Sequence, residues 1–264
     1  MDLQLKDKFV FISGSTAGIG YAIAERFLME GTEVIINGRT QESLDNSIKE
    51  LKKSVPDSKV SGIFADFSKV EEVNNLIKQL PDVDILVNNV GIFEPKEFKD
   101  IPDADWFKFF EVNVMSGVRL SRYLLPKMLE RNEGRILFIS SESAVFIPDE
   151  MIHYGMTKTA MLSVSRGLAQ LTKGTNVTVN TILPGPTKSR GVGGFINDLS
   201  KANDRSVDEV ERDFFKNMRP TSLLQHFTSI EEIANTVVYF ASPLASATNG
   251  ASIRAEGGLI RSIL

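Results

Sequence analysis

The sequence contains no cysteine, only two histidines, and no run of about 20 apolar residues that would span a membrane. The absence of cysteine excludes a disulfide framework, thiol catalysis and a cysteine-bound metal, and two histidines leave little scope for a histidine metal cluster. Residues 1–8 lack the apolar stretch of a signal peptide, and the net charge of -4 carries no nucleic-acid signature. We therefore expect a cytoplasmic protein with no metal, no nucleic-acid partner and no membrane partner.

Short apolar runs alternate with longer stretches in which apolar residues recur every three or four positions. The runs predict strands at residues 9–12, 34–36, 60–64, 83–87, 135–139, 176–183 and 251–254. Helical patterns follow most of them, at about 19–30, 41–54, 69–79, 103–131, 156–171 and 230–240. This alternation predicts an α/β fold with a single doubly wound parallel sheet and helices on both faces. We expect one domain over residues 1–264, in which the polar segment at about 187–228 forms a mobile lid over the substrate, with a helix near 208–216.

Three glycines lie between the first predicted strand and the first predicted helix, in the order Gly14-Ser-Thr-Ala-Gly18-Ile-Gly20. Glycines at this point permit a tight turn and let the backbone approach a pyrophosphate, which then faces the free N–H groups of the helix N-terminus. The spacing differs from the Gly-x-Gly-x-x-Gly fingerprint of many dinucleotide sites. A turn that binds nothing is the alternative.

A tyrosine and a lysine, Tyr154 and Lys158, are four residues apart in a predicted helix and therefore share one face. The ammonium group favours the phenolate, so it is expected to lower the pKa of the tyrosine towards a usable range. The hydroxyl of Ser141, held nearby, can bind an oxygen that takes up charge during a reaction. This set suits hydride transfer to or from a carbon that bears oxygen.

Together these residues resemble the short-chain dehydrogenase/reductase family, from Lys8 to about Gly258. The resemblance rests on the glycine motif, on Asn88-Asn-Val-Gly91, on Asn113, on the 13-residue interval from Ser141 to Tyr154, and on Pro184-Gly185 followed by Thr187. It implies a Rossmann-type nicotinamide-binding oxidoreductase that acts on CH–OH groups and forms a homotetramer or homodimer. Tyr154 would exchange a proton with the carbonyl oxygen, Ser141 would bind that oxygen, Lys158 would bind the nicotinamide ribose, and Asn113 would hold a water that relays protons.

The motifs and the resemblance also supply candidate cofactor contacts. They are Gly14, Ser15, Thr16, Gly18, Ile19, Gly20, Arg39, Asp66, Phe67, Asn88, Gly91, Tyr154, Lys158, Pro184, Gly185 and Thr187. The end of the second strand distinguishes NAD from NADP, because a carboxylate there binds the ribose 2′-hydroxyl whereas an arginine accommodates a 2′-phosphate. Gly38 stands where NAD-dependent relatives carry an acidic residue, and Arg39 follows it, so we expect NADP(H), with NAD(H) possible. Asp66, with Phe67 beside it, is expected to bind the adenine amino group.

Several alternatives remain open at the level of sequence. Ser140 can replace Ser141, because adjacent strand residues point to opposite faces, and Asn113 can simply satisfy buried backbone. We expect Glu142 and Glu94 to be solvated charges near the pocket mouth. His153 is expected at the pocket rim or the surface, and the aromatic residues at 106–110 belong to the core or to an interface.

The sequence favours the prediction of an NADP(H)-dependent enzyme that interconverts a ketone and a secondary alcohol. The lid residues Phe195, Ile196 and Leu199 would cover a largely apolar pocket, formed in part by Phe93 and Met151. A nucleotide-binding scaffold or sensor without turnover is one alternative, and an NAD-preferring alcohol dehydrogenase is another. Epimerase or dehydratase chemistry on nucleotide sugars is a third, against which the short C-terminal region argues.

Overall fold

The computed structural model describes residues 1–189, 191–194, 196, 200 and 204–263. Within them the strands form one seven-stranded sheet in the order β3-β2-β1-β4-β5-β6-β7. The strands are β1 (Phe9–Ile12), β2 (Glu33–Gly38), β3 (Lys59–Phe64), β4 (Ile85–Asn88), β5 (Gly134–Ile139), β6 (Val177–Pro184) and β7 (Ser252–Ala255). Every neighbouring pair is parallel. The predicted doubly wound parallel sheet is therefore confirmed.

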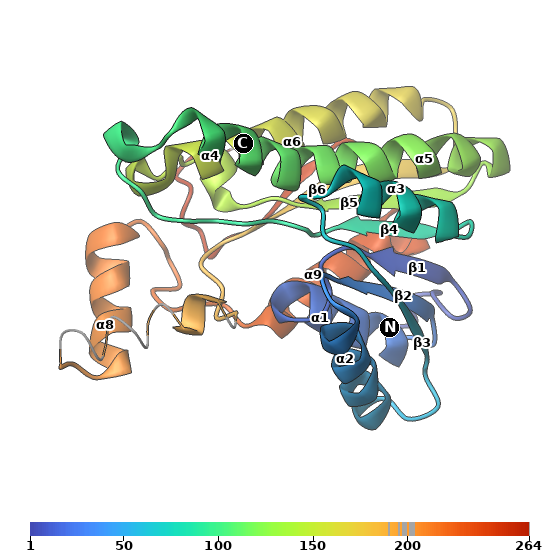
Figure 1. Ribbon diagram of the computed structural model, residues 1–264, viewed down its shortest axis with the longest axis horizontal. Helices are drawn as coiled ribbons and strands as arrows, with labels where there is room; N and C mark the ends of the chain where they lie inside the picture. Colours follow the sequence, from blue (N-terminus) through green and yellow to red (C-terminus); the bar gives the residue numbers. More distant parts are fainter. Residues whose placement is uncertain (190, 195, 197–199, 201–203, 264) are drawn as a thin grey trace.

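Helices cover both faces of this sheet (Figure 1). On one face lie α1 (Gly18–Met29), α2 (Gln41–Ser54) and α9 (Ile230–Ala241), and on the other α3 (Val70–Gln79), α5 (Ser116–Arg131) and α6 (Ile152–Leu171). Each layer has its own buried cluster: Ile23 and Val237 belong to the first, and Leu120 and Met161 to the second. The central strands read as uninterrupted apolar runs because both of their faces are buried. Within the described residues, no helix is both long and apolar enough to cross a membrane.

The helical region predicted at 103–131 is confirmed, but it is not one uniform α-helix. It consists of α4 (Asp103–Phe110), a π-helical turn η2 (Glu111–Met115) and α5. Asn113 sits within the π-helical turn and is buried. Such turns are rare and occur frequently at functional sites, because the extra residue re-aims the side chains of that turn.

The described part of the segment at 187–228, which includes α8 (Val207–Asp213), lies below α4 in Figure 1, beyond the carboxyl ends of the strands. The segment contains α8, which begins with a capping box between Ser206 and Glu209, and the π-helical turn η5 (Phe214–Met218). Ile196, Val210, Phe215 and Phe227 form its small buried cluster. Phe195 and Leu199, two of the residues predicted to cover the substrate, lie outside the described residues. The predicted helix near 208–216 is confirmed, with one buried face.

Candidate active site

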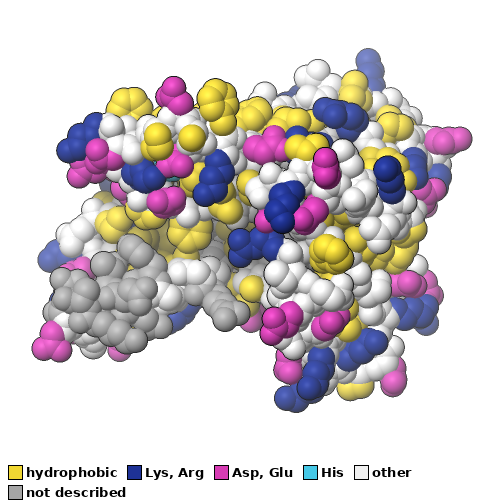
Figure 2. All heavy atoms as spheres, in the orientation of Figure 1, with side chains coloured by type: hydrophobic (Ala, Val, Ile, Leu, Met, Phe, Trp, Pro, Cys, Tyr) yellow, Lys and Arg dark blue, Asp and Glu magenta, His cyan; other side chains and the backbone are white. Residues whose placement is uncertain are grey.

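A cavity of about 380 Å³ opens at the carboxyl ends of the central strands. Its walls come from the residues after β4 and β5, from the end of β6, from the first turns of α6, and from the 187–228 segment. Figure 2 shows hydrophobic side chains gathered in the hollow between the part of the molecule that carries α4 and this segment. Parallel α/β sheets bind their ligands at this edge, so the cavity lies where the fold predicts a site.

The three side chains predicted to carry the chemistry meet in this cavity, since Ser141, Tyr154 and Lys158 all line it. The Lys158 Nζ atom lies 5.5 Å from the centre of the Tyr154 ring and donates a hydrogen bond of 3.0 Å to the carbonyl of Ile139. Ser140 Oγ instead donates to the carbonyl of Lys158 at 2.9 Å, so it serves the packing of α6 on β5. Both serines line the cavity, but this bond engages the Ser140 hydroxyl, so the geometry favours Ser141, whose catalytic role stays a prediction.

The pKa of Tyr154 is raised in the structure, whereas the sequence predicted that Lys158 would lower it. Burial raises the pKa of Tyr154, the negative charge of Glu142 raises it further, and a hydrogen bond with Ser141 lowers it in part. Burial also lowers the pKa of Lys158 to about 8, an effect that Glu142 opposes. Desolvation therefore outweighs the attraction between phenolate and ammonium that the four-residue spacing suggested. Tyr154 stays protonated at neutral pH.

Asn113 braces the first turn of α6 against the loop that follows β4. Its amide nitrogen donates to the carbonyl of Ile92 and to Thr157 Oγ1, both at 3.0 Å, and its oxygen accepts the Ile92 N–H at 2.7 Å. Gly91 lies close to both Asn113 and Lys158. A Cβ at position 91 would lie 3.3 Å from Lys158 Nζ and 3.7 Å from Asn113 Oδ1. Asn113 thus satisfies buried backbone, which was one of the two alternatives, and its predicted role in water relay stays a prediction.

The glycine loop forms a cradle at the start of α1. Gly14 and Gly18 have φ of +62° and +58°, a region that favours glycine, and a Cβ on Gly20 would lie 2.4 Å from Asn89 Nδ2. Ala17 at the N-cap offers no side-chain cap, so the N–H groups of the first turn remain available to an anion. The loop fits a dinucleotide pyrophosphate.

Two asparagines that the sequence interpretation missed hold this loop in place. Asn89 Nδ2 donates to the carbonyls of Ser13 and Gly14 at 3.1 and 2.8 Å. Asn37 Oδ1 accepts the N–H of Gly14 at 3.0 Å. Both asparagines end buried strands, which was the signal available in the sequence. Asn88, which the sequence analysis proposed as a cofactor contact, instead donates to Ser121 Oγ in the core at 3.2 Å.

The end of β2 is closely packed. A Cβ on Gly38 would lie 2.5 Å from Thr16 Cγ2 and 3.0 Å from Ser43 Oγ, so a larger residue at 38 would displace its neighbours. Arg39 next to it is exposed, and its charge contributes to lowering the pKa of Asp66. Burial is the largest single influence and raises that pKa, but the hydrogen bonds from Ser68 and the charges of Lys69 and Arg39 together lower it below its usual value. Phe67 is buried in the core, so only its main chain is available to a ligand.

Comparison with known proteins identifies the family. Residues 8–198 match the family model described as short chain dehydrogenase. The uncharacterized oxidoreductase YvrD of Bacillus subtilis is 52% identical over 266 residues, covering 100% of both chains. This chain is a short-chain dehydrogenase. It is accordingly an NAD(P)-dependent oxidoreductase, as the resemblance implied.

Two further proteins to which this short-chain dehydrogenase is similar are reductases. The 3-oxoacyl-[acyl-carrier-protein] reductase FabG of Aquifex aeolicus is 30% identical over 264 residues, covering 98% of this chain and 100% of the relative. The crystal structure of L-sorbose reductase from Gluconobacter frateurii, complexed with NADPH and L-sorbose, superposes with a TM-score of 0.93. It is 29% identical, and the match covers 100% of both chains.

Two expectations about side chains around the cavity of this short-chain dehydrogenase need correction, and a third agrees with the structure. Glu142, expected to be solvated, is 5% exposed and lines the cavity, because it begins the 3-10 turn η3 (Glu142–Ala144) under the 187–228 segment. His153, expected at the rim or surface, is fully buried, with its ring centre 4.2 Å from that of Phe109. The reason is that α4 packs on the first turn of α6. Glu94, by contrast, is half exposed and pairs with Lys96 at 3.5 Å, as a solvated charge would.

The aromatic residues of α4 divide between the buried core and the exposed surface. Phe109 is buried in the core, whereas Phe107 is 75% exposed and Phe110 is 40% exposed. Successive residues of one helix point in different directions, so a continuous aromatic run cannot serve one environment alone. A role of Phe107 and Phe110 in a subunit interface stays a prediction.

Proposed function

We propose that this short-chain dehydrogenase uses NADP(H) to interconvert a ketone and a secondary alcohol, with Tyr154 as proton donor or acceptor. The observation that carries the proposal is the meeting of Ser141, Tyr154 and Lys158 in one cavity at the carboxyl edge of the sheet. A scaffold or sensor has no need of this set. We also infer that residues 1–264 form one cytoplasmic catalytic domain, with a lid at about 187–228, that assembles as a homotetramer or homodimer.

The residues present fit a nicotinamide dinucleotide. The glycine loop and the uncapped N-terminus of α1 suit its pyrophosphate, and Gly91, Pro184, Gly185 and Thr187 lie at the mouth of the same cavity or within its walls. When bound, this group supplies or accepts the hydride. Arg39 and the packing around Gly38 favour a ribose 2′-phosphate, because a carboxylate at 38 would need space that Thr16 occupies. The NADPH in the L-sorbose reductase structure supports the same choice.

Three side chains of the protein control the proton that is exchanged with the substrate oxygen. In reduction, the Tyr154 hydroxyl donates its proton to the substrate carbonyl oxygen, and its raised pKa keeps that proton in place at neutral pH until it is needed. Ser141 Oγ donates a hydrogen bond to the same oxygen, which takes up negative charge. Lys158, positioned by the carbonyl of Ile139, offsets the charge that develops on the Tyr154 oxygen. In oxidation these proton movements are reversed.

The walls of the cavity limit the substrate. Phe93, Met151, Phe214 and Phe227 line it with apolar surface, which suits a medium-sized or hydrophobic carbonyl compound. Glu142 and Glu150 place two carboxylates in the same wall against the single guanidinium of Arg219, and the remaining negative charge disfavours an anionic group near the reacting carbon. A neutral ketone is therefore the favoured class of substrate. Sugars, steroid-like ketones, xenobiotic ketones and oxoacyl thioesters are the candidates to be tested.

The test is a fluorescence titration of the purified protein with NADPH and NADH, followed by a panel of neutral and anionic ketones. We expect tight NADPH binding, weak NADH binding, and NADPH oxidation with at least one neutral ketone. NADH preference would favour the NAD-dependent alcohol dehydrogenase. NADPH binding without turnover of any ketone would favour the scaffold, and binding of neither nucleotide would overturn the proposal.

A further inference from the structure

The hydroxyl of Ser141 is engaged by the residue that follows it. Ser141 Oγ donates a short hydrogen bond to the carboxylate of Glu142, and it accepts the N–H of Ser143 at 3.1 Å. A serine has one hydroxyl proton, so a proton given to Glu142 is not available to a substrate oxygen. Glu142 thus competes with the substrate for the group that the proposed mechanism needs.

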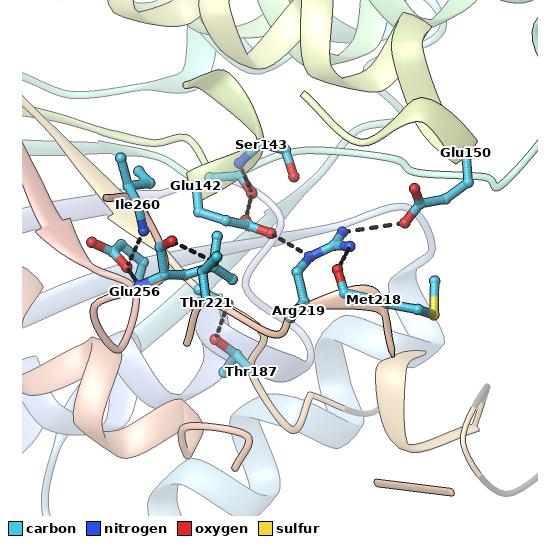
Figure 3. Close-up of polar contacts among 12 residues, drawn as sticks. Glu142, Ser143, Glu150, Thr187, Met218, Arg219, Thr221, Glu256 and Ile260 are labelled. Atoms are coloured by element: carbon cyan, nitrogen blue, oxygen red, sulfur yellow. Dashed lines mark hydrogen bonds and ion pairs between the residues drawn. The ribbon is translucent and has the colours of Figure 1, made fainter. Parts of the chain in front are cut away.

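A cation from the 187–228 segment faces the same carboxylate. Arg219, directly after η5, lies between Glu142 and Glu150 in Figure 3, with its Nε atom 3.5 Å from Glu142 Oε1 and its Nη2 atom 3.2 Å from Glu150 Oε1. The side chains of Arg219 and Glu142 are only 6% and 7% exposed. Arg219 Nη1 also donates to the carbonyl of Met218 at 2.9 Å, which fixes the guanidinium on its own turn.

The other charges around Glu142 do not replace this partner. Lys158, on α6, feels the charge of Glu142, but no ion pair joins the two side chains, and Lys158 Nζ donates to the carbonyl of Ile139. Glu150, on the 3-10 turn η4 (Asp149–Met151), has the same sign as Glu142. The charged groups on the neighbouring elements pair elsewhere: Lys96 with Glu94 and Asp105, Arg254 with Glu256, and Lys188 with Glu211. Among the described residues, Arg219 is the cation that pairs with Glu142.

Because Arg219 and Glu142 are both buried, their pairing affects the proton chemistry of Ser141 and Tyr154. A buried carboxylate without a counter-ion is costly, and it repels the negative charge that forms when Tyr154 gives up its proton. With Arg219 in place, the carboxylate is balanced, so it competes less for the Ser141 proton and opposes the phenolate less. Without Arg219, both effects return.

We propose that Arg219 is a positioning residue that acts on the catalytic serine through Glu142. In the structure the carboxylate is shared: one oxygen faces the Arg219 guanidinium and the other accepts the Ser141 hydroxyl. By balancing the negative charge, Arg219 weakens the hold of Glu142 on the Ser141 proton, so that a substrate oxygen can compete for it. This inference rests on the proposed function.

The experiment compares Arg219→Met, Arg219→Lys, Glu142→Gln and the double variant Glu142→Gln/Arg219→Met. The control is Arg205→Gln, which removes an exposed ion pair of 2.7 Å with Asp213 in the same segment without touching the cavity. The readouts are kcat, KM and the pH profile of kcat/KM for alcohol oxidation, in which activity rises as Tyr154 loses its proton. Thermal melting of the apo-proteins adds a readout that needs no turnover.

We expect Arg219→Met to lower kcat about tenfold with a smaller change in KM, and to move the pH midpoint up by about one unit. Glu142→Gln moves the midpoint down, because it removes the negative charge, and the double variant follows Glu142→Gln rather than Arg219→Met. Arg219→Lys retains most of the activity, and Arg205→Gln behaves as the native protein. In melting, the double variant is more stable than Arg219→Met, since it leaves no unpaired carboxylate.

Three results would overturn the inference: an Arg219→Met pH profile equal to that of Arg205→Gln, purely additive effects in the double variant, or equal melting of the double variant and Arg219→Met. If Arg219→Met does not fold, an unmoved midpoint in Glu142→Gln overturns it equally well. Failure of the proposed function is a separate result, because the native protein itself would then turn over no ketone.

Discussion

The main chain of Gly185, directly after β6, packs against the main chain of Glu256: a Cβ at position 185 would lie 2.7 Å from both Cα and O of Glu256. The Gly185 N–H also bonds the carbonyl of Ala255 at 3.0 Å. Glu256 is itself buried and accepts the N–H groups of Leu259 and Ile260. The floor of the cavity therefore depends on the absence of a side chain at 185.

Gly185→Ala is expected to force this contact apart and to destabilise the protein by about 1–3 kcal/mol, because both neighbours are backbone and cannot rotate away. NADPH binding should weaken together with stability, since Pro184 and Gly185 line the cavity. Urea unfolding and a nucleotide titration measure the two effects. The control is Gly167→Ala on α6, where a Cβ meets nothing within 4 Å and we expect a gain of about 0.5–1 kcal/mol. Equal behaviour of the two variants would contradict the prediction.

Tyr154→Phe should lower kcat by about 10²–10⁴-fold, because it removes the group that exchanges the proton while leaving the ring in place. NADPH affinity should change little. Steady-state kinetics and a fluorescence titration check both parts. Tyr239→Phe, on the partly exposed surface of α9, is the matched control and should leave kcat unchanged. A Tyr154→Phe enzyme with near-native kcat would remove the tyrosine from the mechanism.

Arg39→Ala should weaken NADPH binding by about 10- to 100-fold, which corresponds to a charge-assisted contact of about 1.5–3 kcal/mol. NADH binding should be spared, because NADH lacks the 2′-phosphate that the guanidinium would meet. The measurement is the ratio of the two dissociation constants in the native and variant proteins. Arg26→Ala, on the surface of α1, serves as the control for a general loss of positive charge. Equal losses for both nucleotides would show that Arg39 does not distinguish them.

The lowered pKa of Lys158 gives the apo-protein a specific pH dependence of stability. The pKa falls from 10.5 in the unfolded chain to about 8 in the fold, so between these values the unfolded chain binds more protons at this residue. The free energy of unfolding should therefore rise with pH from about 8 to about 10.5 relative to a Lys158→Met variant, by up to about 3 kcal/mol. Urea unfolding of both proteins at pH 7, 8, 9 and 10 measures the difference. A constant difference across these pH values would contradict the lowered pKa.

The parts of the molecule that could be predicted from sequence are those determined by nearby residues. The apolar run 9–12, the glycines at 14–20 and the four-residue spacing of Tyr154 and Lys158 each contain their own signal. The sheet, the glycine loop and the position of this pair in one cavity could therefore be predicted. The environment of Glu142 was not found, because it depends on Arg219, far along the chain, and on how the intervening segment folds. For the same reason the burial of His153, which needs α4 to pack on α6, was missed.

The π-helical turn at 111–115 was missed for a different reason. Its residues, Glu-Val-Asn-Val-Met, fit an ordinary α-helix as well as they fit the wider turn. What distinguishes the two is the set of hydrogen bonds that Asn113 makes to Ile92 and Thr157, both of which belong to other elements. Tertiary contacts decide such local choices, and a single sequence does not display them.

The 187–228 segment leaves and rejoins the domain at one place. Thr187 and Thr228 form a parallel bridge, their hydroxyls lie 3.0 Å apart, and Lys188 donates to the carbonyl of Thr228 at 2.8 Å. Because the two ends are clasped together, the intervening chain can be lengthened or replaced at little entropic cost to the sheet. We therefore expect that a corresponding stretch from another member of the family, joined at Thr187 and Thr228, would change the cavity wall that Phe214, Met218 and Phe227 supply and leave the sheet as it is.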